Sequence, residues 1–333
     1  MPWQDLEGKN VLITGANGFL PAYMVETLLY LNDRKLNKPV NVLGLVRNRA
    51  KALKRFSHYE GRKDFELLVQ DAAAPVIADR KIDYIVHAAS QASPKYFGTD
   101  PVGTLLPNVL GTYHLLELAR KNAVEGFLFF SSGEVYGEVD ERKVPTKEDD
   151  YGYLDPTNIR SCYAESKRIG ETMCVSWHHQ YAVPAKIVRP FHTYGPGMDL
   201  QDGRVFADFI ADILHTRNIV LKSDGSAIRA FCYLSDAVTG FFTALLKGKN
   251  AEAYNVGNDK GEISILGLAN LLVELFPSKK LKVIRDEKVG SDGYLKSKIT
   301  RNCPDISKMR TLGWEPKYSL REGFERTVRS FSA

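Results

Sequence analysis

The chain has 333 residues, enough to bury a sizeable core as one large domain or two coupled ones. Hydrophobic residues make up 44% of the chain, which excludes a disordered polar protein. Its 45 basic and 40 acidic side chains leave a net charge of +5, too small an excess to indicate nucleic acid or a membrane surface as a partner.

The N-terminal residues and the cysteines bear on location. Residues 1–9 lack the basic start and apolar stretch of a signal peptide, and no apolar run approaches the roughly 18 residues that span a bilayer. The four cysteines show no CxxC spacing, and the histidines form no HExxH motif. We therefore expect a cytoplasmic protein with reduced thiols, no membrane partner and no metal site.

Short apolar runs alternate with helix-length segments through the first half of the chain. Helices are expected at Gly18–Leu31, Pro101–Lys121 and Ser161–Tyr181. The apolar runs predict buried parallel strands at Asn10–Thr14, Val40–Val46, Phe65–Val69, Asp83–Ala88, Gly126–Ser131 and Pro184–Arg189. This alternation predicts an α/β fold with a doubly wound parallel Rossmann sheet.

The pattern changes after about Pro190, where Gly195-Pro196-Gly197 interrupts the chain. Helices are expected at Val205–Thr216, Leu234–Lys247 and Ile265–Phe276, with short strands between them and a loop or lid at residues 288–298. We therefore predict a dinucleotide-binding domain of residues 1–190 and a smaller, partly interleaved mixed α/β substrate domain of residues 191–333.

A glycine-rich turn joins the first predicted strand to the first predicted helix. Its glycines let the backbone approach a pyrophosphate at a helix N-terminus, where free N–H groups and the helix dipole favour negative charge. Pro21 stands where a third small residue is expected, but proline is tolerated in the first helical turn. The turn predicts cofactor contacts by Gly15, Asn17, Gly18, Phe19 and Leu20.

The ends of the next strands would also face a dinucleotide. The second strand ends at Arg47, which can accept the 2′-phosphate of NADP or stack on the adenine of NAD, so the choice of cofactor stays open. The basic stretch from Arg47 to Arg55 is either a solvated helix face or a phosphate contact. Further contacts are expected from Asp71, Ala72, Ala88, Ala89, Ser90 and Ser131.

Tyr163 and Lys167 are four residues apart, so they lie on one face of their predicted helix. A phenol with a pKa of about 10 is a poor base at neutral pH, but a nearby ammonium group and a cofactor charge favour the phenolate. Ser132, after the fifth strand, either hydrogen-bonds a sugar oxygen or caps a turn. The sequence predicts that Tyr163 removes a proton beside a bound dinucleotide.

Several motifs together resemble the extended short-chain dehydrogenase/reductase family over essentially the whole chain: TGxxGF, HAA, the segment 108–112, the serine pair 131–132 and YxxxK. Within that family, Ser132–Gly137 resembles a segment of nucleotide-sugar 4,6-dehydratases and UDP-glucuronate decarboxylases. In such enzymes the tyrosine removes the C4 hydroxyl proton while hydride leaves C4 for the nicotinamide.

The resemblance implies bound NAD, with NADP left open, and a nucleotide-diphosphate sugar as the partner. It adds cofactor contacts by Asn108 and Pro190 to those of Tyr163 and Lys167. It also implies a homodimer that pairs through the helices at 101–121 and 161–181.

The acids after Ser132 separate the subgroups. Dehydratases carry an Asp-Glu pair, whereas Gly133 precedes Glu134 here. A lone glutamate resembles the decarboxylases, because a 4-keto uronic acid is a β-keto acid that loses carbon dioxide without a leaving-group acid. Arg301 is the best match, to within one residue, for their catalytic arginine. Other matching segments imply substrate contacts by Gln91, Arg204, Val205 and Arg229, the arginines lying near the diphosphate or only in surface ion pairs.

Three positions depart from the decarboxylase pattern: Ser132 replaces threonine, Gly133 replaces serine, and Gly197 replaces an arginine. We predict a UDP-glucuronate decarboxylase-like enzyme with Tyr163, Lys167, Ser132, Glu134 and Arg301 as its catalytic residues. The alternative is a C4 epimerase, 4,6-dehydratase or C4 dehydrogenase on the same scaffold. A catalytically silent dinucleotide-binding regulator is a third hypothesis, disfavoured by the intact Tyr163, Lys167 and Ser132.

Overall fold

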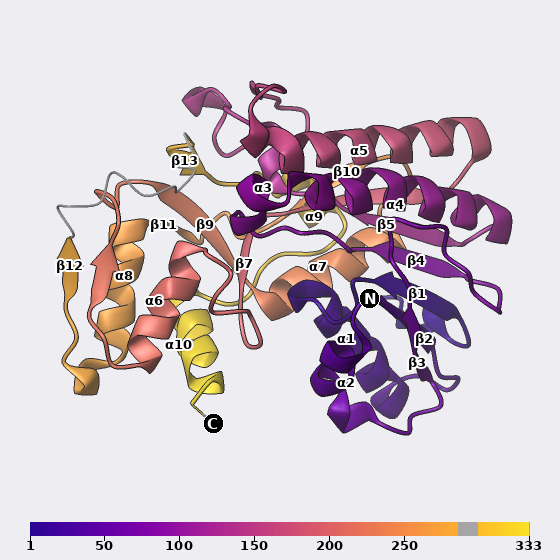
Figure 1. Cartoon of the computed structure of the whole chain (residues 1–333), viewed down its shortest axis with the longest axis horizontal. Helices are drawn as coiled ribbons and strands as arrows, with labels where there is room; N and C mark the ends of the chain where they lie inside the picture. The colour runs from indigo at the N-terminus through magenta and orange to yellow at the C-terminus, as the bar shows by residue number, and fades with distance from the viewer. Residues whose placement is uncertain (286–298, 333) are drawn as a thin grey trace.

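A parallel sheet dominates residues 1–285 and 299–332, the part of the chain that the computed structural model describes (Figure 1). Within these residues it has seven strands, in the order β10-β6-β5-β4-β1-β2-β3. They are β1 (Asn10–Thr14), β2 (Asn41–Val46), β3 (Phe65–Val69), β4 (Tyr84–His87), β5 (Gly126–Phe130), β6 (Ala185–Pro190) and β10 (Ala253–Val256). The order reverses between β1 and β4, which confirms the predicted doubly wound sheet. The loop or lid predicted at 288–298 lies outside the described residues.

Helices cover both faces of this sheet because its strands are apolar on both sides. Phe127 and Phe129 of β5 pack with Leu116 and Cys174 on the face covered by α4 (Pro101–Asn122) and α5 (Cys162–Tyr181). Leu128, also of β5, belongs to the core on the opposite face. That face is covered by α1 (Phe19–Arg34), α2 (Arg49–Arg55) and α7 (Leu234–Lys247). The near-continuous apolar runs thus reflect burial on two faces.

A smaller unit follows β6. Its central strand β9 (Ile228–Tyr233) pairs antiparallel with β11 (Glu262–Ser264) and parallel with β7 (His192–Tyr194) and β13 (Arg301–Asn302). A separate pair joins β8 (Ile219–Leu221) to β12 (Val283–Arg285). Phe206, Phe231 and Phe324 lie in the core that this unit shares with α6 (Val205–Leu214), α8 (Ile265–Leu275) and α10 (Leu320–Ser330).

The two units exchange elements along the chain. Both α7 and β10 come from beyond residue 190, yet α7 packs on the large sheet and β10 forms its outer strand beside β6. The short helix α9 (Ser307–Thr311) contacts β10 as well. The domain boundary at residue 190 therefore stays a prediction, and the structure adds residues 234–256 to the large sheet.

The ends of most predicted elements move by one to three residues. Helix α1 continues to Arg34, and α6 stops at Leu214 before Thr216, whose φ of 55° is incompatible with a right-handed helix. Helix α2 lies in the basic stretch for which a helix face was one alternative, whereas the patterns missed α9, α10 and the short helix α3 (Lys95–Thr99). Across the described ranges, every helix is too short or too polar to cross a membrane.

Candidate active site

A cleft of about 1800 Å³ opens along the carboxyl ends of the parallel strands, between the large sheet and the smaller unit. Parallel α/β sheets bind ligands at this edge, where the strand order reverses. The cleft brings together most of the residues that the sequence singled out: Gly15, Asn17, Gly18, Phe19, Leu20, Arg47, Asp71, Ala72, Ala88, Ala89, Ser90, Gln91, Ser131, Ser132, Glu134, Tyr163, Lys167, Pro190, Arg204, Val205 and Arg229.

The glycine-rich turn forms a cradle for a ligand at the start of α1. Gly15 has φ of 65°, and a Cβ added there would lie 2.9 Å from the Cα atom of Ala89. Only glycine fits this close approach between the ends of β1 and β4. Pro21 is the third residue of α1, where its missing N–H has no intrahelical partner to lose. The proline is thus compatible with the turn.

A hydrogen-bond chain joins the ends of β1 and β4. His87 Nε2 lies 3.0 Å from the carbonyl oxygen of Pro107, so this nitrogen donates, and Nδ1 accepts from the Thr14 hydroxyl at 2.9 Å. Thr14 Oγ1 in turn accepts from the backbone N–H groups of Ala88 and Ala89, at 3.2 and 3.1 Å. Burial lowers the pKa of His87 to about 3, and the charge of Lys167 adds to this. The imidazole is therefore neutral and fixes the floor of the cleft.

The strand end at Arg47 is basic, as the sequence indicated. Arg47 and Lys51 both line the cleft, while Asn48 is occupied as the N-cap of α2, accepting from the backbone N–H of Lys51 at 2.9 Å. Arg55, at the other end of α2, instead forms an ion pair with Glu26 at 3.2 Å. The basic stretch thus divides between the cleft and an ordinary surface contact.

Tyr163 and Lys167 are buried on one face of α5. Burial raises the pKa of Tyr163, while its hydrogen bond with Ser132 and the charge of Arg204 act in the opposite direction. Burial lowers the pKa of Lys167 to about 7, opposed by the charge of Glu171. Lys167 Nζ donates to the carbonyl oxygen of Phe130 at 2.6 Å. The phenol therefore depends on nearby donors and cations to ionise.

Ser132 and Glu134 lie on a short 3-10 turn, η3 (Gly133–Tyr136), directly after β5. Ser132 Oγ accepts from the backbone N–H of Glu134 at 3.2 Å, so this serine caps the turn, and its hydroxyl also acts to lower the pKa of Tyr163. The Glu134 carboxylate forms an ion pair with Arg160 at 3.2 Å. Arg160 also lines the cleft. The sequence did not predict this ion pair, because Arg160 is 26 residues from Glu134 and lies on a separate short turn before α5.

Gly133 occupies the position where dehydratases carry an acid. A Cβ added at Gly133 would lie 3.3 Å from the ring of Phe191, which packs against the buried Val135 and Tyr136. A longer side chain at this position would have to displace that ring. The structure thus leaves Glu134 without a neighbouring acid.

The arginines expected near the diphosphate face the cleft from the smaller unit. Arg204 donates to the carbonyl oxygen of Ala92 at 3.2 Å and pairs with Asp202 at 3.4 Å. Arg229 donates to the carbonyl oxygens of Ile228 and Ile299, at 2.8 and 2.9 Å. Both contribute positive charge to the cleft, so neither is confined to a surface ion pair.

Two predicted site residues do not line the cleft. Asn108 is buried in α4 and donates to Ser166 Oγ of α5 at 3.0 Å, which gives it a packing role between the helices. Arg301 forms a two-point ion pair with Glu262, at 2.7 and 2.8 Å. The neighbouring Asn302 lines the cleft instead, and its buried Oδ1 has no partner within the described residues. Alternation along β13 turns the two side chains to opposite faces.

One known protein family matches most of this chain. Residues 11–257 match the NAD dependent epimerase/dehydratase family. The chain belongs to this family. Its membership confirms the predicted relationship and the prediction of an NAD-dependent enzyme.

Curated relatives match nearly the whole chain. UDP-glucuronic acid decarboxylase 3 of Arabidopsis thaliana is 36% identical over 323 residues, covering 96% of this chain and 88% of the relative. UDP-glucuronic acid decarboxylase 1 of Xenopus tropicalis is 34% identical over 335 residues, covering 98% of this chain and 73% of the relative.

Solved structures share the fold. The UDP-glucose 4-epimerase of Thermotoga maritima, crystallised with UDP-glucose, aligns with a TM-score of 0.83 at 24% identity and covers 97% of this chain and 98% of its own. The UDP-glucuronic acid 4-epimerase of Bacillus cereus, crystallised with NAD, aligns with a TM-score of 0.79 at 25% identity, covering 97% and 98%. These likenesses confirm the predicted fold class.

Proposed function

We propose that this enzyme oxidises C4 of UDP-glucuronate with NAD and that the oxidised sugar then loses carbon dioxide. The observation that carries the proposal is the buried Tyr163 phenol, which lines one cleft with Ser132, Lys167 and Glu134, while a glycine and not an acid precedes Glu134. The decarboxylase relatives, about one-third identical over nearly the whole chain, support the choice of substrate.

The chain's own residues fit a dinucleotide. The Gly15 cradle leaves room for a pyrophosphate at the start of α1, and Ser90 in the cleft wall has a buried hydroxyl without a partner in the described residues. Bound NAD would hold the hydride taken from C4 and return it. Arg47 and Lys51 also suit a 2′-phosphate, so calorimetric titration with NAD and NADP is the measurement that decides between them.

Tyr163 takes the proton of the C4 hydroxyl as hydride leaves the same carbon. Ser132 favours the ionised phenol, and Lys167 supplies positive charge from one helical turn away. The resulting 4-keto uronic acid loses carbon dioxide by cleavage of its C5–C6 bond, and the electron pair passes to the C4 carbonyl. We assign to Glu134, oriented by Arg160, the handling of the proton that C5 then gains.

An alternative outcome has one observation in its favour. Asn302, and not an arginine, faces the cleft from β13. A neutral amide gives less charge to hold a uronate carboxylate, so a C4 epimerase or C4 dehydrogenase acting on a neutral sugar is the second candidate. A 4,6-dehydratase is disfavoured because Phe191 packs over Gly133, where the acid for water loss would stand.

Mass spectrometry of reaction products tests the proposal. The enzyme is incubated with NAD and, separately, with UDP-glucuronate, UDP-glucose, dTDP-glucose and a GDP-sugar. Loss of carbon dioxide from UDP-glucuronate is the expected result. Loss of water would indicate a dehydratase, and a new isomer of unchanged mass would indicate an epimerase. Net formation of NADH without release of carbon dioxide would indicate a dehydrogenase. Undiminished turnover by Tyr163→Phe would overturn the assigned proton transfer.

We also propose a homodimer that pairs through α4 and α5. These helices pack on each other, and both keep large apolar side chains exposed: Val102, Leu106, Leu110, Tyr113, Ile169 and Val175. A second copy would cover such a surface. Sedimentation velocity should give a dimer of about twice 37.3 kDa, and Leu110→Glu should give monomers.

The cysteines, none of which forms a disulfide, support a cytoplasmic location.

A further inference from the structure

Helix α5 carries a third buried polar residue in line with Tyr163 and Lys167. Glu171 follows Lys167 by four residues, so the three side chains occupy one face on successive turns. Glu171 is 9% exposed and Lys167 is 2% exposed. The proposed reaction uses the first two residues of this row and gives no task to the third.

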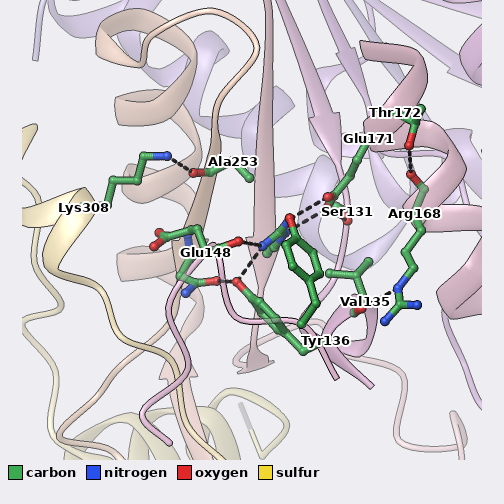
Figure 2. A network of polar contacts seen from close by, with 12 residues as sticks. Ser131, Val135, Tyr136, Glu148, Arg168, Glu171, Thr172, Ala253 and Lys308 are labelled. Carbon is green, nitrogen blue, oxygen red and sulfur yellow. Dashed lines mark hydrogen bonds and ion pairs between the residues drawn. The ribbon is translucent and has the colours of Figure 1, made fainter. Parts of the chain in front are cut away.

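Glu171 joins β5 to β6 through two partners (Figure 2). Ser131, at the end of β5, donates its hydroxyl hydrogen to Glu171 Oε1 at 2.5 Å. Arg189 of β6 donates to both carboxylate oxygens, from Nε at 2.8 Å and from Nη2 at 2.6 Å. A buried two-point pair of this kind is geometrically strict, and removing one partner leaves the other as an uncompensated charge.

Arg189 extends the network to Tyr136, the last residue of η3. Its Nη1 donates to the Tyr136 hydroxyl at 2.9 Å and to the carbonyl oxygen of Glu148 at 2.7 Å. The Tyr136 hydroxyl donates to Asn255 Oδ1 of β10 at 2.6 Å. Since Tyr136 is the last residue of η3, the turn that bears Ser132 and Glu134 is held on one side by Ser131 and on the other by Tyr136.

The same pair reaches Lys167 from the opposite direction. Lys167 Nζ donates to the carbonyl oxygen of Phe130, the last residue of β5. The Glu171 carboxylate accepts from Ser131, the next residue, so both side chains of α5 hydrogen-bond to adjacent residues at the end of this strand. Neither Glu171 nor Arg189 lines the substrate cleft. Both line a second cavity of about 990 Å³ that lies behind the network.

We propose that Glu171 and Arg189 are positioning residues, which fix the turn 132–136 against α5 and so set the distance between Ser132 and Tyr163. They act on turnover through Ser131 and Tyr136, and the charge of Glu171 also helps to keep Lys167 protonated. The inference rests on the proposed function, because it assumes that Tyr163 accepts the proton. A displacement of about 1 Å between reacting groups is enough to slow such a reaction.

Glu171→Gln and Ser131→Ala, alone and combined, test this role. Gln keeps the volume of Glu but cannot pair with Arg189 as a charge, and Ala removes only the hydroxyl. Each variant should lower kcat about tenfold or more and leave KM within about threefold, and the double variant should be no slower than the slower single one. Glu171→Gln, which lies outside the cleft, should also leave the Kd for NAD within about threefold. Glu165→Gln is the matched control: Glu165 lies on α5, pairs with Arg168 at 3.4 Å and makes no contact with Ser131, so kcat should not change.

The contrary results are distinct. Unchanged kcat in Glu171→Gln, additive losses in the double variant, or losses confined to NAD affinity or melting temperature would each reduce the pair to a structural role. If Glu171→Gln does not fold, Ser131→Ala alone decides on the same criteria. Turnover retained in Tyr163→Phe, or no turnover by the unaltered enzyme on any nucleotide sugar, defeats the proposed function and this inference together. An inactive Tyr163→Phe beside fully active Ser131→Ala defeats this inference only.

Discussion

The ring of Phe97 stacks on the ring of Tyr163, with centroids 5.1 Å apart and an angle of 14° between the planes. Phe97 is 2% exposed and comes from α3, a helix of five residues that packs against the start of α4. The stack confines the phenol from one side, while Ser132 lies in the same cleft and favours ionisation of the hydroxyl. The direction of the Tyr163 hydroxyl is therefore set jointly by an apolar and a polar contact.

Replacing Phe97 with Leu should loosen this arrangement without removing any group that reacts. An aromatic pair contributes about 1 kcal/mol beyond its buried area, so we expect kcat to fall about fivefold to tenfold. Steady-state rates with the accepted nucleotide sugar give the value. The Kd for NAD, measured by calorimetry, should stay within about twofold, and unaltered kcat would show that Ser132 alone orients the phenol.

Glu134→Gln should separate the first step from the later ones. The carboxylate pairs with Arg160 at the sugar end of the cleft, and the first hydride transfer requires only Tyr163, Lys167 and Ser132. We expect the variant to reduce bound NAD in a single turnover, seen as absorbance at about 340 nm, while formation of the finished sugar nucleotide falls about a hundredfold. Product formation at the normal rate would make Glu134 a structural residue.

Gly15→Ala should weaken cofactor binding. Its Cβ would approach the Ala89 backbone to 2.9 Å, at a φ of 65°. We expect the affinity for NAD to fall at least tenfold and the free energy of unfolding to fall by about 1–3 kcal/mol. Gly61→Ala is the control, because Gly61 has φ of 81° with nothing within 4 Å of the added Cβ. It should share the backbone strain and keep the affinity.

Acid should destabilise the fold through His87. Its pKa in the fold is about 3, below the value of about 6.5 expected for the unfolded chain. The unfolded state therefore binds more protons between these values, so the stabilising contribution is present above about pH 6.5 and is lost as the pH falls towards 3, by up to about 1.4 kcal/mol per pH unit. Urea unfolding between pH 7 and 4 measures the slope.

The slope should become shallower in His87→Gln, which cannot be protonated. Exposed His215 serves as the comparison, and His215→Gln should leave the slope as it is. Equal slopes in the unaltered protein and in His87→Gln would mean that the imidazole gains a proton in the fold without cost, against the contacts with Thr14 and Pro107.

The sequence predicted the large sheet well, because the apolar runs and their alternation with helix-length segments both indicate parallel strands there. Six apolar runs that alternate with helix-length segments predict strands buried on two faces, and parallel strands place their carboxyl ends at one edge of the sheet. The Gly15 turn, Ser132 and Tyr163 follow from that edge, because each lies at or beside the carboxyl end of a strand. Local patterns therefore sufficed for the cofactor half of the cleft.

Contacts between distant segments were beyond such patterns. Phe97, Arg160 and Glu171 each meet a partner that no local spacing reveals: Tyr163, Glu134 and Arg189. A signal for Glu171 existed in its four-residue distance from Lys167. At β13 the alternation of side chains decides whether 301 or 302 faces the cleft, and a strand of two residues has too little pattern to fix it.

The outer strand β10 restricts how this chain can be cut or rewired. A fragment ending at residue 190 would leave the edge of β6 unpaired and strip α7 from one face of the sheet, exposing Phe130 and Val188. Split-protein reporters, domain transplants and circular permutation therefore have to keep residues 234–256 with the N-terminal half. Residues 1–190 and 234–256 therefore have to be expressed together, even though about forty residues of the smaller unit lie between them.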